Sequence, residues 1–216
     1  MCDQDSNAGA SSGADSGASS KSEKKRGRII SRLLSKLLRH HLPHSGLFYS
    51  QDGYVLVQDI LGYQSFLDEG VALDEIINVV RQNGKQRYQL DGDESVLGGL
   101  RIRACQGHSF YIPPHLLYVR IGSEDVDEYP ESCHGSYRVH EKSIMRGGLL
   151  KMERSMVHIG QGLDAMSGMR SDCDMVIWID LRALVESGMP VYVSHNGVIL
   201  CEGPIHSKYF SKVEYI

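Results

Sequence analysis

The pattern of apolar and polar positions predicts that the first half of the chain consists of helices followed by a β-hairpin. Between Ile29 and His41, apolar residues recur every three or four positions, which predicts an amphipathic helix. Ala72–Gln82 repeats this spacing. Two strand-like runs follow at Gln86–Leu90 and Leu100–Ala104, joined by a polar, glycine-rich loop. Helices followed by a β-hairpin are the ingredients of a winged helix, although other small α+β modules contain them too.

The second half of the chain has the pattern of a β-rich lobe. Met175–Ile179 is a nearly continuous apolar run, which is typical of a strand buried on both faces. Val191–Ser194 and Val198–Cys201 flank Asn196-Gly197, a dipeptide that favours a tight hairpin turn. The sequence therefore predicts an α+β protein whose second lobe is mainly sheet.

Changes in composition suggest where the lobes begin and end. Met1–Ser20 is rich in Ser, Gly and Ala, and Lys21–Arg28 carries five Lys and Arg residues. Too little apolar surface is present there to bury, so we expect a disordered tail over residues 1–28. Its basic run could be a nuclear signal, an arm that touches nucleic acid, or a solubilising linker. Pro113-Pro114 and the acidic stretch Glu124–Glu131 mark a boundary, which predicts a winged-helix lobe over residues 29–120 and a second lobe over 121–216.

The length, net charge and cysteine content of the chain bear on where in the cell the protein is expected. The chain has 216 residues, a formal net charge of −4, and five cysteines that are far apart and odd in number. A disulfide framework is therefore not expected, and we predict a reduced intracellular protein, cytoplasmic, nuclear or both. No apolar run is long enough for a membrane span or a secretory signal, so no membrane partner is expected. Nothing indicates an obligate oligomer, and we expect a monomer.

Two basic strings, Leu38-Arg39-His40 and Ile102–Ser109, point to an anion site. Each places guanidinium and imidazole groups beside apolar packing residues. The rigid fork of an arginine fits two phosphate oxygens and stays charged at any working pH. On the first helix, Arg32, Lys36, Arg39 and His40 recur on the face opposite the apolar stripe. Either string alone is equally compatible with surface arginines and partly buried histidines.

Further polar motifs occur in the second lobe. Cys133–Ser136 ends a predicted strand, and its glycine would let a ligand approach the backbone closely. Taken alone, that string is better explained by a structural turn. Ser155–His158 alternates like a strand, so we expect Arg154 and His158 on the same side of it. Ser167–Arg170 falls in a loop with room for a polar ligand.

Taken in order, these strings resemble a known enzyme family. From about Ile29 to Phe210, the chain carries L-R-H, D-G-Y-V, K-x-R-[FY], R-A-x-Q-G-H-S, H-G-[TS], G-L-x-x-M-x-R, S-G-M-R and S-x-N-G-V-I-L. It is similar to the RNA 2'-phosphotransferases, which use NAD to remove an internal 2'-phosphate from spliced tRNA. The resemblance implies a winged-helix lobe that receives RNA, an ADP-ribosyltransferase-like lobe that holds NAD, and a phosphate site between them.

The resemblance also implies roles for individual residues. The catalytic residues would be Arg39, His40, Arg103 and Arg154. The NAD pocket would be lined by His134, Gly135, Ser136, His158, Ser167, Gly168 and Arg170. RNA would be contacted by Arg32, Lys36, Lys85, Arg87, Gln106 and His108. Met156 and Gly160 stand where the family has a histidine and a serine, which affects the expected hydrogen bonds around NAD.

The implied reaction uses NAD as a co-substrate and needs no metal. The RNA 2'-phosphate attacks the ribose carbon of NAD that carries nicotinamide, giving a 2'-phospho-ADP-ribosylated RNA intermediate. The neighbouring ribose hydroxyl then attacks phosphorus and releases ADP-ribose 1'',2''-cyclic phosphate. Two alternatives stay open: an ADP-ribosyltransferase that acts on terminal phosphates of nucleic acids, and a non-catalytic RNA-binding protein.

Overall fold

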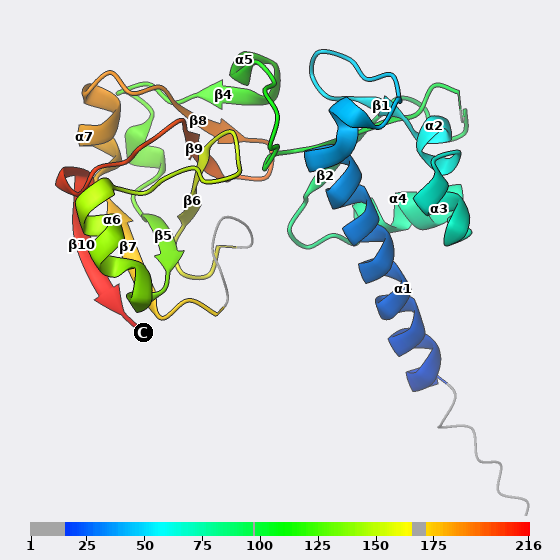
Figure 1. Cartoon of the computed structure of the whole chain (residues 1–216), viewed down its shortest axis with the longest axis horizontal. Coiled ribbons are helices and arrows are strands. Elements are labelled where there is room, and N and C mark those ends of the chain that lie inside the picture. The colour runs from blue at the N-terminus through cyan, green and yellow to red at the C-terminus, as the bar shows by residue number, and fades with distance from the viewer. Residues whose placement is uncertain (1–15, 97, 166–171) are drawn as a thin grey trace, which may run out of the picture.

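The chain folds into two lobes that lie side by side (Figure 1). The computed structural model describes residues 16–96, 98–165 and 172–216, with the side chains of 16–20 left out. One lobe combines helices with a three-stranded sheet, and the other is built on a seven-stranded sheet, so the predicted α+β class is confirmed. No helix in these ranges is both long and apolar enough to cross a membrane.

The first lobe packs its helices against a small antiparallel sheet. The helices are α1 (Ser16–Lys36), α2 (Val57–Leu61), α3 (Gln64–Asp68) and α4 (Leu73–Arg81). The strands are β1 (Val55–Leu56), β2 (Tyr88–Asp91) and β3 (Arg101–Ala104), in the order β1-β3-β2. The apolar stripe of α1, including Ile30 and Leu34, is buried against Phe66, Ile76 and Ile102. The helix over 72–82 and the β-hairpin that follows it are therefore confirmed.

Helix α1 begins earlier than the sequence predicts. Arg26 donates from Nε to one carboxylate oxygen of Glu75 at 2.8 Å and from Nη2 to the other at 3.0 Å, and its Nη1 lies 3.4 Å from Glu69. This paired contact fastens α1 to α4. The prediction of disorder is wrong for residues 16–28, because ion pairs with distant residues supply the tertiary contacts that composition does not reveal. Residues 1–15 lie outside the described part of the chain.

The C-terminal end of α1 changes its winding. Leu37–His41 forms a π-helical turn, and Leu42–His44 follows as a 3₁₀ turn that contains Pro43. A π turn is wider than an α turn and shifts the direction of the side chains after it. Arg32 and Lys36 are exposed, whereas Nε and Nη2 of Arg39 are fully buried. The prediction that Arg39 shares the exposed basic face is therefore wrong.

The second lobe is built on an antiparallel sheet in the order β10-β7-β5-β6-β9-β8-β4. The strands are β4 (Tyr118–Arg120), β5 (Ser132–Ser136), β6 (Val157–Gln161), β7 (Met175–Ile179), β8 (Val191–Ser194), β9 (Ile199–Cys201) and β10 (Phe210–Tyr215). Its helices are α5 (Pro114–Leu117), α6 (Glu141–Gly147) and α7 (Leu181–Glu186), with 3₁₀ turns at Val126–Glu128, Arg138–His140 and Ser207–Tyr209. The buried strand over 175–179 and the tight hairpin are confirmed.

The lobe boundary lies earlier than predicted. Strand β4, residues 118–120, pairs with β8 of the large sheet, and Pro114 starts the short helix that precedes β4. A boundary after residue 120 would place an edge strand of the second sheet in the first lobe. The chain therefore passes from one lobe to the other before β4.

Hydrogen bonds to backbone carbonyls help to hold the two lobes together. The backbone N–H of Ser155 donates to the carbonyl of His108 at 2.8 Å. On the other side, Nδ2 of Asn196 donates to the carbonyl of Lys85 at 2.9 Å. A small apolar cluster fills the junction: Ile112, Leu117, Tyr118, Met156, Val198 and Leu200. The segment that carries R-A-x-Q-G-H-S thus lies directly against the turn that carries Arg154.

Candidate active site

Arg39 is a buried cation with unused hydrogen-bond donors. Its Nε and Nη2 are buried and have no hydrogen-bond partner among the described residues. The guanidinium packs against Gly107, where an added Cβ would lie 3.4 Å from its central carbon. A buried charge is costly unless it is paired and hydrogen-bonded. The position therefore suits a bound anion that accepts from both nitrogens.

Other basic groups surround Arg39 from both lobes. Burial lowers the pKa of Arg39, and the charges of Arg87 and Arg154 lower this pKa further. Burial also lowers the pKa of His40, and Arg39 and Arg154 add to that effect. These effects favour the neutral form of His40. Arg154 comes from the second lobe, so its effect on both groups places it in the same electrostatic neighbourhood, which favours an anion with more than one negative charge.

Arg154 lies in a turn and not in a strand. Strand β6 starts at Val157, and the backbone N–H of Arg154 closes a turn on the carbonyl of Lys151 at 3.1 Å. The prediction that Arg154 and His158 share one side of a strand is wrong, because the extended backbone begins too late. Arg154 is exposed and His158 is buried. Arg154 lines a pocket of about 620 Å³ whose wall includes residues of both lobes, among them Phe110, Tyr111, Lys151 and Met152.

Arg103 is held by protein groups. Its Nε and Nη2 donate to Oε1 of Gln89 at 3.2 and 3.0 Å, and its Nη1 donates to the carbonyls of Asp52 and Leu116 at 3.3 and 3.1 Å. Its guanidinium carbon lies 4.5 Å from the centre of the Tyr54 ring. Most of its donors are occupied. The structure thus differs from the expectation that Arg103 offers an open fork to phosphate, because strand alternation directs it toward Tyr54 and away from the core.

Gln106 and His108 are buried at the junction between the lobes. Gln106 is 7% exposed, and its carboxamide lies 2.8 Å from Nε2 of His158 in the other lobe. His108 is 1% exposed and stacks edge-on against Phe110, with 5.3 Å between ring centres. Burial lowers the pKa of His108 to about 3. Interlobe packing encloses both side chains, and His108 also lines the pocket that contains Arg154, so contact of these two residues with RNA stays a prediction.

The histidine of β6 is also enclosed. Nδ1 of His158 donates to the carbonyl of Met156 at 3.0 Å. Burial is the main cause that lowers the pKa of His158 to about 3, and the charge of Arg154 acts in the same direction. His158 is thus a neutral group that joins the lobes through Gln106.

His134, Gly135 and Ser136 lie where two strands separate. The pairing of β5 with β6 ends at Cys133, and beyond it Nδ1 of His134 donates to the carbonyl of His158 at 2.8 Å. Gly135 and Ser136 continue to pair with β7. A side chain thus replaces the strand ladder at this point. The predicted residues Ser167, Gly168 and Arg170 lie outside the described residues.

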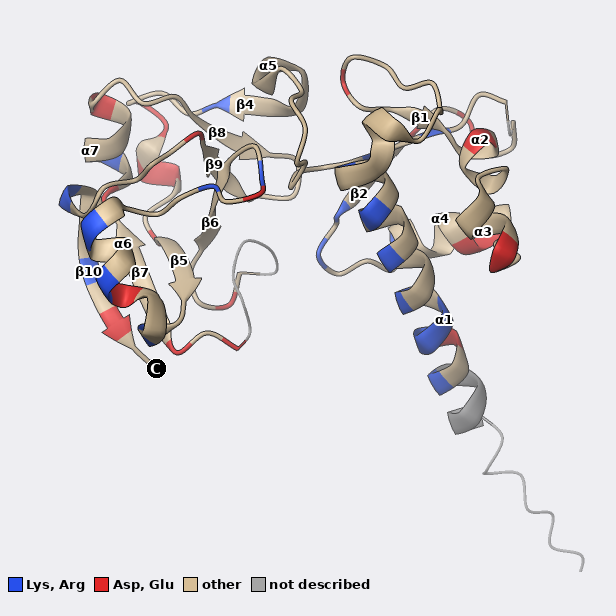
Figure 2. Cartoon of the chain, viewed as in Figure 1, with Lys and Arg blue, Asp and Glu red and all other residues tan. Residues whose placement is uncertain are grey.

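The exposed face of α1 carries the other predicted RNA contacts. Arg32 and Lys36 line a shallow pocket of about 450 Å³ that also includes His40 and Arg87. Lysine and arginine follow one another along this helix (Figure 2). Sequence reasoning misses Arg28, which lies on the same face, because composition places it in the tail. Its four-residue spacing from Arg32 is the signal that could have found it.

No group of three or more His, Cys, Asp or Glu side chains suited to a metal ion occurs in the described ranges. The family comparison covers residues 25–203, which match the RNA 2'-phosphotransferase, Tpt1 / KptA family. The chain belongs to this family. The predicted RNA 2'-phosphotransferase resemblance is therefore confirmed.

The chain is also similar to individual proteins that carry the name tRNA 2'-phosphotransferase 1. The tRNA 2'-phosphotransferase 1 of Danio rerio is 37% identical over 174 residues, which cover 76% of this chain and 73% of the relative. The Homo sapiens protein of the same name is 35% identical over 76% of this chain and 65% of its own length. The Mus musculus protein of that name is 34% identical over 81% of this chain and 71% of its own length. The similarity to this RNA 2'-phosphotransferase family thus extends through both lobes.

Proposed function

We propose that the protein removes an internal 2'-phosphate from RNA and transfers it to NAD, with tRNA as the RNA. One observation carries the proposal: a buried guanidinium with two unused donors lies where basic groups of both lobes gather. A phosphate monoester carries up to two negative charges and several acceptor oxygens, so it satisfies both needs. The names of the relatives support tRNA as the molecule that carries it.

The two lobes divide the binding work in this proposal. The first lobe, with its helices and three-stranded sheet, serves as a winged-helix RNA module, and the basic face of α1 supports this assignment. The second lobe, with its seven-stranded antiparallel sheet, serves as an ADP-ribosyltransferase-like module for NAD. The phosphate then lies at the junction.

The residues at the end of β5 suit NAD. Gly135 has no side chain, so a ligand could approach its backbone closely. His134 and Ser136 flank it with polar groups, and His134 is already oriented by its hydrogen bond to the His158 carbonyl. When bound, NAD supplies a ribose carbon that carries nicotinamide as leaving group and a neighbouring hydroxyl. We assign Ser167, Gly168 and Arg170 to this pocket from the family motif alone.

The cationic residues stabilise charge on the phosphate. Arg39 holds two phosphate oxygens through Nε and Nη2, and because both nitrogens are buried in the free protein, neighbouring groups must move aside when the phosphate binds. Neutral His40 contributes one N–H donor and one acceptor nitrogen at the edge of the site. Arg154 neutralises charge that builds up at phosphorus from the side of the second lobe. Donors fixed in this way are worth roughly 10²–10³-fold in rate each.

Arg103 acts as a positioning residue in this proposal. Its guanidinium ties Asp52 and Gln89 of the first lobe to the Leu116 carbonyl next to the start of the second. It thereby fixes the angle between the segments that carry the anion site. This role differs from direct phosphate binding, and the two roles make different predictions for the lysine variant.

One incubation tests the proposed function. The protein is mixed with NAD and an oligonucleotide that carries one internal 2'-phosphate, and RNA products and nicotinamide are measured by mass spectrometry. We expect one nicotinamide released for each phosphate removed, and loss of activity in Arg39→Met but not in Arg146→Gln, an exposed residue of α6. Accumulation of ADP-ribosylated RNA would support the alternative transferase, and absence of nicotinamide would refute the proposal.

A further inference from the structure

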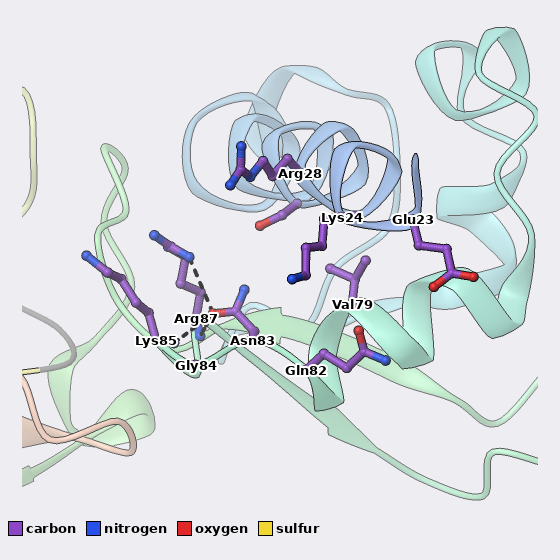
Figure 3. Close-up of a pocket in the computed structure, with 11 residues that line it drawn as sticks. Glu23, Lys24, Arg28, Val79, Gln82, Asn83, Gly84, Lys85 and Arg87 are labelled. Carbon is purple, nitrogen blue, oxygen red and sulfur yellow. Dashed lines mark hydrogen bonds between the residues drawn. The ribbon is translucent and has the colours of Figure 1, made fainter. Parts of the chain in front are cut away.

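A basic groove lies beside the N-terminal half of α1, away from the candidate phosphate site. Its volume is about 440 Å³, and we call it the α1 groove. One wall is α1, with Lys24, Gly27 and Arg28, and the other is the turn between α4 and β2, with Asn83, Lys85 and Arg87 (Figure 3). None of the described residues that line it is aromatic.

The basic groups that line the α1 groove come from both of its walls. Figure 3 shows the nitrogen ends of Lys24, Arg28, Lys85 and Arg87 on the same side, and the carboxylate of Glu23 on the opposite side. Four cations thus face one strip of surface without an acidic group among them in this view. Such a strip attracts a polyanion.

The second wall of the groove is held in a fixed shape. Oδ1 of Asn83 accepts from the backbone N–H of Lys85 at 3.1 Å and from Nη1 of Arg87 at 3.4 Å. Gln86 adopts a left-handed backbone with φ of 43°. The carbonyl of Lys85 accepts from Asn196 of the second lobe at 2.9 Å. The turn is therefore pinned by its own side chains and by the other lobe.

The α1 groove continues toward the phosphate site. The shallow pocket that contains His40 shares Arg28, Ser31 and Arg87 with the groove. Cations recur at every fourth residue of α1 from Lys24 to Lys36, which spaces them about 6 Å apart along the axis. Lys24 therefore lies on the order of 24 Å from His40 along the helix. A nucleic-acid strand that rises ~3.4 Å per nucleotide would span this path with about seven nucleotides.

We propose that the α1 groove binds the backbone phosphates of an RNA strand several nucleotides away from the 2'-phosphate, so that longer substrates bind more tightly. This proposal rests on the proposed function, because the 2'-phosphate fixes one end of the path. The absence of aromatic side chains from the lining residues means that bases are not stacked there, so we expect little dependence on sequence. Lys24 lies just before the family match over residues 25–203, whereas Arg28, Lys85 and Arg87 lie within it.

The test compares a paired groove variant with a matched control. The groove variant is Lys24→Gln with Arg28→Gln. The control is Lys142→Gln with Arg146→Gln, which removes the same charge from exposed positions on α6 of the second lobe. Substrates are a short oligonucleotide with only two nucleotides on either side of the 2'-phosphate, and two versions extended by ten nucleotides on the 5' or the 3' side. Steady-state kinetics give kcat and KM for each pair, and circular dichroism checks that both variants are folded.

We expect the groove variant to raise KM about tenfold for one of the two extended substrates. Its kcat should match that of the wild type and the control, and its KM should rise clearly less for the short substrate than for that extended substrate. The salt dependence of binding to that extended RNA should weaken by roughly 0.7 in logarithmic slope for each backbone phosphate that the variant no longer neutralises. Equal constants for wild type and groove variant on both extended substrates would overturn the inference while leaving the proposed function intact. Failure of the wild type on all three substrates would instead overturn the proposed function. An equal rise in KM for the control would show that only overall charge matters, which also overturns the inference.

Discussion

Replacing Arg39 by methionine should make the protein more stable and inactive. Methionine keeps an unbranched chain that packs against Gly107, but it removes a buried charge whose Nε and Nη2 have no partner among the described residues. It also removes repulsion from Arg87 and Arg154, which lower the pKa of Arg39. A site shaped for an anion is unfavourable in the free protein, and the variant relieves that cost.

The magnitude follows from the two unused donors. Each buried unsatisfied polar group costs about 1–3 kcal/mol, and replacing buried ions by apolar groups stabilises proteins by up to about 4 kcal/mol. Allowing for imperfect packing of the new side chain, we expect Arg39→Met to raise the free energy of unfolding by about 1–3 kcal/mol. For a chain of this size, each kcal/mol corresponds to roughly 2–4 °C in Tm. The same variant should lose at least about 10²-fold in kcat/KM.

Thermal unfolding with and without ligand is the assay. Wild-type Tm should rise when adenosine 2'-monophosphate is added, and Tm of the variant should be higher at the start and unaffected by the nucleotide. Lys142→Gln serves as the control for a change in surface charge. If Arg39→Met lowers Tm by several degrees, Arg39 is a structural residue and the reasoning from its unused donors is refuted.

Three further variants test other contacts. The pKa of His158 is about 3 in the folded protein and ~6.5 in the unfolded chain, so its contribution to stability is lost as pH falls from 6.5 toward 3. When pH is lowered from 7.5 to 5.5, the free energy of unfolding measured in urea should therefore fall by about 1 kcal/mol less for His158→Gln than for wild type. Identical decreases would contradict this. In Arg103→Lys, the lysine ammonium cannot bond to both Gln89 and the Leu116 carbonyl as the guanidinium does, so the free energy of unfolding should fall by about 1–3 kcal/mol in thermal melts. An unchanged Tm with lost activity would instead favour direct phosphate binding by Arg103. Arg26→Gln breaks the paired contact with Glu75 and should speed hydrogen exchange of backbone amides in residues 21–28, while unchanged exchange would show that α1 holds without it.

Local patterns predict the elements that pack through one regular face. Helix α4 and the β8–β9 hairpin both follow from short-range signals, the first from apolar spacing and the second from Asn196-Gly197. Edge strands β4 and β10 lack a strong apolar run, and they are defined by pairing with β8 and β7 from elsewhere in the chain. Their existence depends on non-local contacts and cannot be derived from local sequence.

The candidate site shows the same division. The motifs identify Arg39, His40 and Arg154 by type, but burial of Arg39 depends on the π turn at Leu37–His41 and on the approach of Gly107. Hydrogen bonds to residues far apart in the sequence determine whether the other predicted side chains are available to a ligand. Gln106, which the motif assigns to RNA, instead meets His158 of the other lobe. Residue type predicts which chemistry is possible, and tertiary contacts determine which groups are available for it.

The central claim is that cations of both lobes act on one phosphate. The most direct measurement is the ratio of affinities for a short RNA with and without its 2'-phosphate, determined by calorimetry for wild type, Arg39→Met, Arg154→Met and the double variant. We predict that each single variant reduces the ratio and that the double variant loses less than the sum of the two, because both residues bind the same group. A ratio unchanged in Arg154→Met, or strictly additive losses, would contradict the account.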